Sequence, residues 1–195
     1  MFLGYARILV CPQCGEKKEV MTLLSGNTCG AVYWSDKKTE APMCPEVSKV
    51  QKCPVCNYYY LITDQEEVLN KNNETIECGR LTYPEMKEAF FQFMYEGFQS
   101  KHDEYEVRML LHHAYNDYHN RGKDKRIPRI EDKALFHDNG MWLINNVLID
   151  DLTKAEFYRE IGEFNKSSEL IKRIRSIAEL IEVRIKKKDS VVFRL

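Results

Sequence analysis

The chain has 195 residues, a formal net charge of -1 at pH 7 and a sequence pI of about 6.5. This length suits one or two domains with a real core, and the near-zero charge gives no global field that would draw the chain onto nucleic acid or an anionic membrane. No apolar run approaches membrane-spanning length and no cleavable signal precedes the first cysteine, so we expect a protein of the reducing cytoplasm.

Two matched cysteine turns stand in the first third of the chain. They are Cys11-Pro12-Gln13-Cys14-Gly15 and Cys53-Pro54-Val55-Cys56-Asn57. In each, Pro fixes φ early in the turn, and the Gly or Asn after the second Cys tolerates a positive φ. Two such turns facing each other supply four converging thiolates. We therefore predict a metal site whose ligands are Cys11, Cys14, Cys53 and Cys56, with zinc favoured over iron.

Short strands are predicted around these turns, at 6–10, 18–24, 31–34 and 58–62. The order of strand, cysteine turn, small sheet, cysteine turn and strand resembles a zinc ribbon or a rubredoxin-like fold over about residues 6–63. The resemblance implies a small β-rich module that a structural metal closes. The 38 residues between Cys14 and Cys53 exceed the roughly 15 to 20 of a compact ribbon, so we interpret 25–45 as an insertion.

Three of the seven cysteines lie outside the two pairs. Cys29 and Cys44 fall within the insertion. They are either extra metal ligands or, as we expect more often for a lone Cys beside apolar residues, small buried hydrophobic side chains. Cys78 has no cysteine near it, and we predict that it is a free thiol in a short strand at 75–81.

From residue 82 the apolar residues repeat at helical spacing. We predict helices at 83–98, 102–120, 138–162 and 165–188. The predicted fold class is therefore α+β. It comprises a zinc-ribbon or rubredoxin-like module at 1–80, followed by a four- to five-helix region at 81–195.

The last helix pair resembles a tetratricopeptide repeat. The residues at its spacing are Ala155, Tyr158, Gly162, Phe164, Ser167, Ile171 and Ile174. In that family, small residues let two antiparallel helices approach and larger ones fill the seam. Ser167 stands where the family prefers Ala, and the chain carries one good copy. Because a solenoid needs about three repeats, the resemblance implies a repeat-like helical hairpin within a globular bundle.

Histidines follow the second predicted helix at positions 112, 113 and 119. His112 and His119 share a face, which suits a metal or a proton relay. No carboxylate stands at ligand spacing beside them, so we expect a polar or partly buried helix face. A di-iron helical bundle would need Glu-x-x-His motifs, and their absence from the sequence argues against a rubrerythrin-like protein.

Four cysteines on one metal leave no open position for catalysis, and no nucleophile, phosphate loop or dinucleotide motif appears, so we predict no catalytic residues. The function that fits is a non-enzymatic adaptor that binds a protein or peptide through its helical region. Two alternatives stay open. One is a nucleic-acid-associated regulator that uses the zinc ribbon, with the basic residues at 123–129 and 186–188 as further candidate phosphate contacts. The other is a rubredoxin-like electron carrier.

Overall fold

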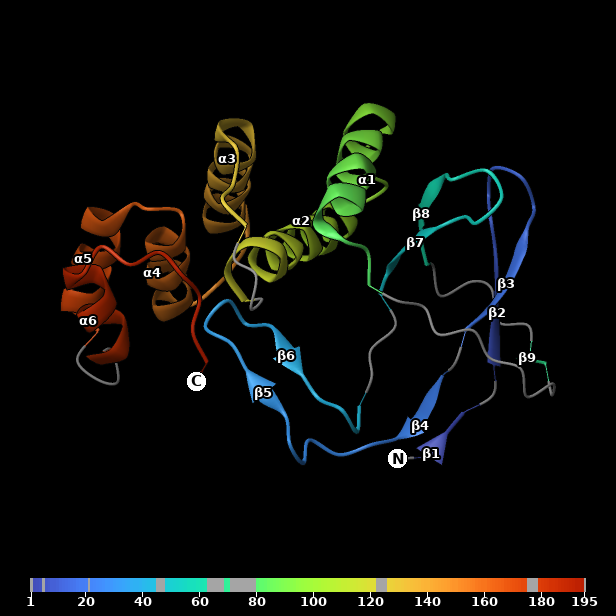
Figure 1. Cartoon of the computed structure of the whole chain (residues 1–195), viewed down its shortest axis with the longest axis horizontal. Coiled ribbons are helices and arrows are strands. Elements are labelled where there is room, and N and C mark those ends of the chain that lie inside the picture. Colours follow the sequence, from blue (N-terminus) through green and yellow to red (C-terminus); the bar gives the residue numbers. More distant parts are fainter. Residues whose placement is uncertain are drawn as a thin grey trace. The chain divides into compact units, whose positions relative to one another are not determined.

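The computed structural model describes residues 2–4, 6–20, 22–44, 48–62, 69–70, 80–121, 126–174 and 179–194. Short strands come first and helices follow (Figure 1), which confirms the predicted α+β class. The strands are β1 (Phe2–Leu3), β2 (Ala6–Val10), β3 (Lys17–Val20), β4 (Leu23–Ser25), β5 (Val32–Tyr33), β6 (Thr39–Glu40), β7 (Val50–Lys52), β8 (Tyr59–Leu61) and β9 (Leu69–Asn70). The helices are α1 (Tyr83–Glu96), α2 (Lys101–Asn116), the π-helical turn η1 (Asp117–Arg121), α3 (Ile130–Asn146), α4 (Asp151–Glu160), α5 (Phe164–Arg173) and α6 (Glu179–Lys186).

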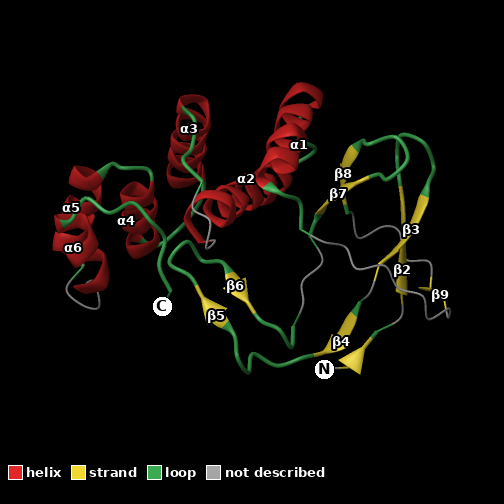
Figure 2. Cartoon of the chain, viewed as in Figure 1, coloured by secondary structure: helices red, strands yellow, loops and turns green. Residues whose placement is uncertain are grey.

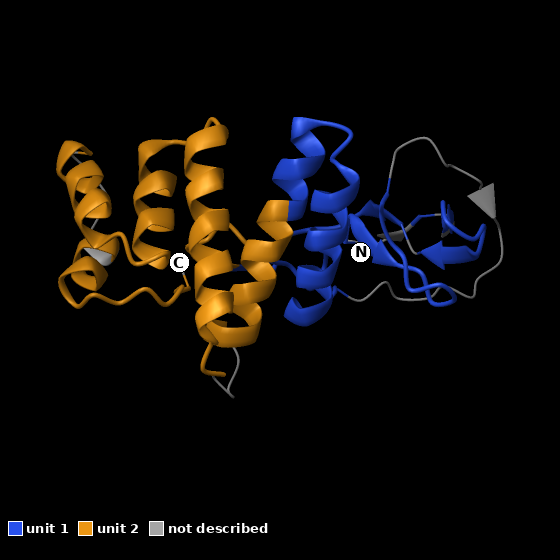
Figure 3. Ribbon diagram, turned by 90° about the horizontal axis from the view of Figure 1, so that it is seen from above, with its two compact units in different colours: residues 1–32, 39–107 blue, residues 33–38, 108–195 orange. Residues whose placement is uncertain are grey.

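The chain forms two compact units (Figure 3). Unit 1 comprises residues 1–32 and 39–107, and unit 2 comprises residues 33–38 and 108–195. Unit 1 holds both cysteine turns and α1. The boundary between the units falls inside α2, so this helix contributes residues to both. The division of the sequence into domains at residue 80 stays a prediction.

The strands of unit 1 form small antiparallel ladders (Figure 2). β2 pairs with β3, so that Val10 lies opposite Lys17, and β9 pairs with the other edge of β2. β7 pairs with β8, and this hairpin frames the second cysteine turn as β2 and β3 frame the first. Because each ladder has only two or three strands, neither cysteine turn is supported by a large sheet.

Helix α1 begins with a capping box and attaches to β8. The Glu85 carboxylate accepts hydrogen bonds from Thr82 N at 3.0 Å and Thr82 Oγ1 at 2.8 Å, which satisfies a donor that the first helical turn leaves unpaired. The side-chain amide of Gln92 bonds both backbone groups of Tyr59, at 3.1 and 2.8 Å. These polar contacts fix α1 against the strand that leaves the second cysteine turn.

The prediction of one helix over 138–162 is wrong, because α3 and α4 are separate helices. Val147 is extended and ends α3, and Asp150 is extended and begins α4. The Asp150 side chain accepts from Thr153 N at 2.9 Å, which is the contact of an N-cap. The predicted helix at 165–188 is likewise divided, because α5 ends at Arg173 and α6 begins at Glu179.

Helices α4 and α5 form the predicted helical hairpin. Gly162 in the connection has φ 86°, a conformation that favours glycine. Ser167 is buried, and its Oγ donates to Ala155 O at 2.6 Å. The seam continues through a buried apolar cluster formed by Ala155, Ile171, Ile181 and Phe193. In the described ranges, no helix is long and apolar enough to cross a membrane.

Candidate metal centre

The two cysteine turns have the same backbone geometry. Gly15 and Asn57, the residues after each second Cys, have φ 75° and 60°, as the sequence predicts. In the first turn Gly15 N donates to Cys11 O at 2.9 Å, and in the second Asn57 N donates to Cys53 O at 3.0 Å. The first Cys of each turn also donates its N–H across the hairpin, to Glu16 O and Tyr58 O respectively. Local sequence therefore builds two equivalent turns.

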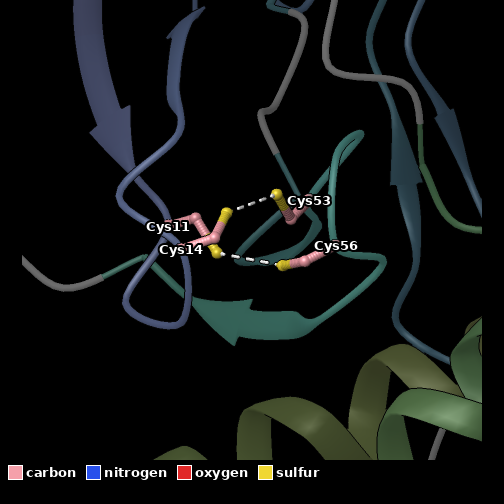
Figure 4. A group of neighbouring side chains, drawn as sticks. All are labelled: Cys11, Cys14, Cys53 and Cys56. Carbon is pink, nitrogen blue, oxygen red and sulfur yellow. Dashed lines mark hydrogen bonds between the residues drawn. The ribbon is translucent and has the colours of Figure 1, made fainter.

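The turns face each other and bring the four predicted sulfurs together (Figure 4). All four Sγ atoms lie within 4.8 Å of one another. Cys11 Sγ lies 3.6 Å from Cys56 Sγ, and Cys14 Sγ lies 3.5 Å from Cys53 Sγ. Four sulfurs at about 2.3 Å from a tetrahedral ion are about 3.8 Å apart. The donor set and its spacing thus fit one metal ion with four thiolate ligands.

The thiols perturb one another strongly. The backbone N–H of Cys56 is the main cause that lowers the pKa of Cys53, to about 6. A hydrogen bond from the backbone of Glu16 lowers the pKa of Cys14, but partial desolvation of its sulfur and the neighbouring thiols outweigh it and raise the pKa to about 12. Four thiolates at this spacing repel one another, and a bound divalent cation offsets that repulsion.

One side of the centre is closed by apolar side chains. Cys11 and Cys53 are buried and join a cluster with Leu9, Val20 and Tyr60, whereas Cys14 and Cys56 are exposed. Tyrosines of the 58–60 run, directly after the second cysteine turn, could serve as a nucleic-acid stacking platform or as core beside the metal centre. Burial of Tyr59 and Tyr60 favours the core.

The cysteines of the insertion stand outside this group. Cys29 is exposed and Cys44 is half-buried, so the prediction of a small buried hydrophobe is wrong for Cys29. Within the described ranges, neither joins the cluster of metal-ligand atoms around Cys11. Cys78 lies outside the described residues.

A second cluster, in unit 2, was not predicted. His112 is fully buried, and its Nε2 lies 2.8 Å from Glu160 Oε2. The ligand-type atoms of Asp36, His112 and Glu160 lie within 4.8 Å of one another. The expected polar or partly buried helix face is instead fully buried at His112, and the carboxylates beside it do not come from its own helix. Two carboxylates reach it from distant parts of the chain.

The protein's own donors already pair with both carboxylates of this second cluster, whereas His112 Nδ1 has no hydrogen-bond partner among the described residues. Asp36 accepts from Asn116 Nδ2 at 2.9 Å and pairs with the Arg121 guanidinium. Glu160 Oε2 accepts from Asn116 Nδ2 at 3.1 Å in addition to its contact with His112. A cation here would compete with Arg121 for Asp36. We therefore interpret the group as a buried polar network, which we call the Asp36 network, and not as a metal site.

Opposite shifts of pKa show how the Asp36 network holds its charge. Burial and repulsion by the Glu156 and Asp36 carboxylates raise the pKa of Glu160 well above its ordinary value. Burial lowers the pKa of His112 to about 3. Burial opposes the charge of Asp36 as well, but His113 and Arg121 outweigh it and lower the pKa of Asp36. Burial and the nearby carboxylates therefore favour the protonated form of Glu160, burial favours the neutral form of His112, and the neighbouring cations favour the ionised form of Asp36.

No sequence signal pointed to this network. Asp36 and Asn116 are 80 positions apart, and His112 and Glu160 are 48 apart. Asp36 lies in the turn between β5 and β6 and resembles any surface turn residue in the sequence. His112 and Asn116 stand four positions apart on one face of α2, but this spacing does not by itself indicate a buried network.

Comparison with known proteins adds no assignment. No family model, curated protein or solved structure matches the chain. The chemistry of its residues and their geometry therefore carry the functional interpretation.

Proposed function

We propose that this chain is a zinc-binding, non-enzymatic adaptor that recognises another protein or peptide through its helical region. The metal has a structural role in this proposal. All four ligands are cysteines on two matched turns, which is typical of closed structural zinc sites, whereas catalytic zinc keeps an open position. Unit 1 has only short ladders, so a metal that joins the two turns adds the stability that a small sheet lacks.

The observation that supports a binding role is an exposed apolar stripe on α1. Phe91, Met94 and Tyr95 are 54%, 48% and 93% exposed, and their spacing of three and four places them on one face. The buried face of the same helix carries Met86, Ala89, Phe90 and Phe93. Exposed aromatic and Met side chains gathered on one face are typical of protein interfaces.

Crosslinking from the stripe tests the adaptor role. The photoreactive residue p-benzoylphenylalanine is placed at position 95, and in a control protein at position 148, where Leu148 is equally accessible. We expect one polypeptide to crosslink from position 95 and not from 148. The purified partner should then bind the unmodified protein and bind the Phe91→Ser/Met94→Ser variant at least about tenfold more weakly. Equal binding to both proteins would refute the proposal.

Elemental analysis of the purified protein tests the metal. One zinc ion per chain, lost on Cys53→Ser, is the expected result. Bound iron with a red colour would instead favour the electron-carrier alternative. Salt-dependent binding to DNA or RNA, if it were as tight as binding to the protein partner, would favour the nucleic-acid alternative.

A further inference from the structure

A cavity of about 360 Å³ lies in unit 1 beside the candidate metal centre. Pro12 of the first cysteine turn and Tyr58 of the second hairpin form part of its wall. The remaining wall comes from β2, from β8, and from the end of α1 through the start of α2. Phe93 and Phe98 contribute rings whose centroids lie 6.1 Å apart. The volume is at the lower end of small-ligand sites and is large enough for one long side chain.

The charged side chains that line the cavity are acidic. Glu96 and Asp103 line it, and none of its lining residues is Lys, Arg or His. Both acids are held by neutral donors: Glu96 Oε2 accepts from Tyr58 Oη at 2.7 Å, and Asp103 Oδ2 accepts from Ser100 Oγ at 2.8 Å. The hydrogen bond to Glu96 is the main cause that raises the pKa of Tyr58, to about 12.

This combination selects one class of ligand. An anion would be repelled by both acids, and a neutral apolar group would remove them from water without a partner. A small metal ion would leave the aromatic walls unused. A guanidinium satisfies both features, because its planar donors bind carboxylates in pairs while its face stacks on aromatic rings. The C-terminal end of α1, which also lines the cavity, favours positive charge as well.

We infer that the cavity between the first cysteine turn and the end of α1 binds the guanidinium of an arginine in a partner polypeptide. The inference rests on the proposed adaptor function and names the chemistry of its partner. Tyr95 of the exposed stripe directly precedes Glu96 of the cavity on α1. Consecutive helix residues point about 100° apart, so a partner segment would have to curve around the end of α1 to contact both.

Two short peptides test the site directly. The metal-loaded full chain, labelled with ¹⁵N, is titrated with acetyl-Gly-Arg-Gly-amide and separately with the same peptide containing citrulline, which is neutral and nearly the same shape. We expect the Arg peptide to shift the amide signals of 96–99 and 59–61 saturably, with the citrulline peptide binding at least about tenfold more weakly. Equal shifts, or none with either peptide, would overturn the inference.

Charge-removing variants locate the effect. Glu96→Gln and Asp103→Asn keep their hydrogen-bond acceptors and should each weaken binding of the Arg peptide about tenfold. Glu104→Gln removes the same charge one residue along α2, off the cavity lining, and should leave binding unchanged. Equal losses in all three variants would refute a specific site.

The outcomes also separate this inference from the adaptor proposal. A partner captured at the stripe whose binding ignores Glu96→Gln/Asp103→Asn would overturn the arginine site and leave the adaptor role standing. Binding of the Arg peptide without any stripe-dependent partner would support the arginine site and overturn the adaptor role.

Discussion

Replacing Glu160 by Gln is expected to remove a pH-dependent contribution to the stability of unit 2. The Glu160 side chain is fully buried, between His112 and the Arg159 guanidinium, whose nearest nitrogen is 3.9 Å from Oε1. Burial and nearby carboxylates raise its pKa well above 4.5. Gln has almost the same shape as protonated Glu but cannot lose a proton. The substitution therefore changes the titration of the network and preserves its packing.

The magnitude follows from proton linkage. Above pH 4.5 the unfolded chain has lost the Glu160 proton, whereas the folded protein keeps it until the raised pKa is reached. The stability due to this group is fully present below 4.5 and is lost as pH rises through the folded pKa. One proton corresponds to about 1.4 kcal/mol per pH unit. The free energy of unfolding of the wild type, relative to Glu160→Gln, should thus fall by about that amount per unit within this window.

Other titrating groups face Glu160 and are common to both proteins. Burial lowers the pKa values of His112 and His113, so their contribution is present above pH 6.5 and is lost as pH falls. The remaining charged neighbours are Asp36, Arg121, Glu156 and Arg159. Because these groups are present in both proteins, the comparison removes their direct contribution, and the difference reports on Glu160 together with its coupling to them.

Tryptophan fluorescence provides the assay. Both tryptophans of the chain, Trp34 and Trp142, belong to unit 2, so urea unfolding followed by this signal reports on unit 2 and not on the metal centre. Unfolding is measured from pH 5.5 to 8.5 for the wild type, Glu160→Gln and the exposed control Glu169→Gln. Parallel profiles for wild type and Glu160→Gln would show that Glu160 is ionised in the folded protein and would refute the reasoning.

Three further predictions concern the metal centre and the helices. Cys53→Ser should release the metal and unfold the strands of unit 1, while most of the helical circular dichroism signal remains. Cys29→Ser, at an exposed cysteine, should retain the metal. Metal analysis and circular dichroism spectra of the two variants check both expectations. Asp150→Ala removes the cap contact with Thr153 N and should lower the free energy of unfolding by about 1 kcal/mol; no change in the urea midpoint would contradict the cap. In Gly162→Ala the added Cβ has no atom within 4 Å, but the backbone there has φ 86°. We therefore expect the free energy of unfolding to fall by about 1 to 2 kcal/mol from backbone strain alone. An unchanged urea midpoint would show that the connection relaxes.

The sequence by itself determined the cysteine turns and the α+β class. Both depend on local rules: a Pro and a residue that tolerates positive φ shape each turn, and helical periodicity marks the region after residue 82. The helix boundaries were harder to predict from the sequence. The break between α3 and α4 depends on Asp150 acting as a cap, and the apolar periodicity continues through it, so the pattern alone indicated one long helix.

Only the tertiary structure decided which distant residues meet. Asp36, His112 and Glu160 come from three separate segments, and each looks like an ordinary surface residue in its own segment. The acidic cavity has the same origin, because Glu96 and Asp103 line it together with aromatic side chains from the second cysteine hairpin. Turns and helices follow from interactions a few residues apart, whereas burial and charge neighbourhood depend on how the segments pack. That is why the candidate metal ligands could be predicted from the sequence, whereas the buried network and the cavity could not.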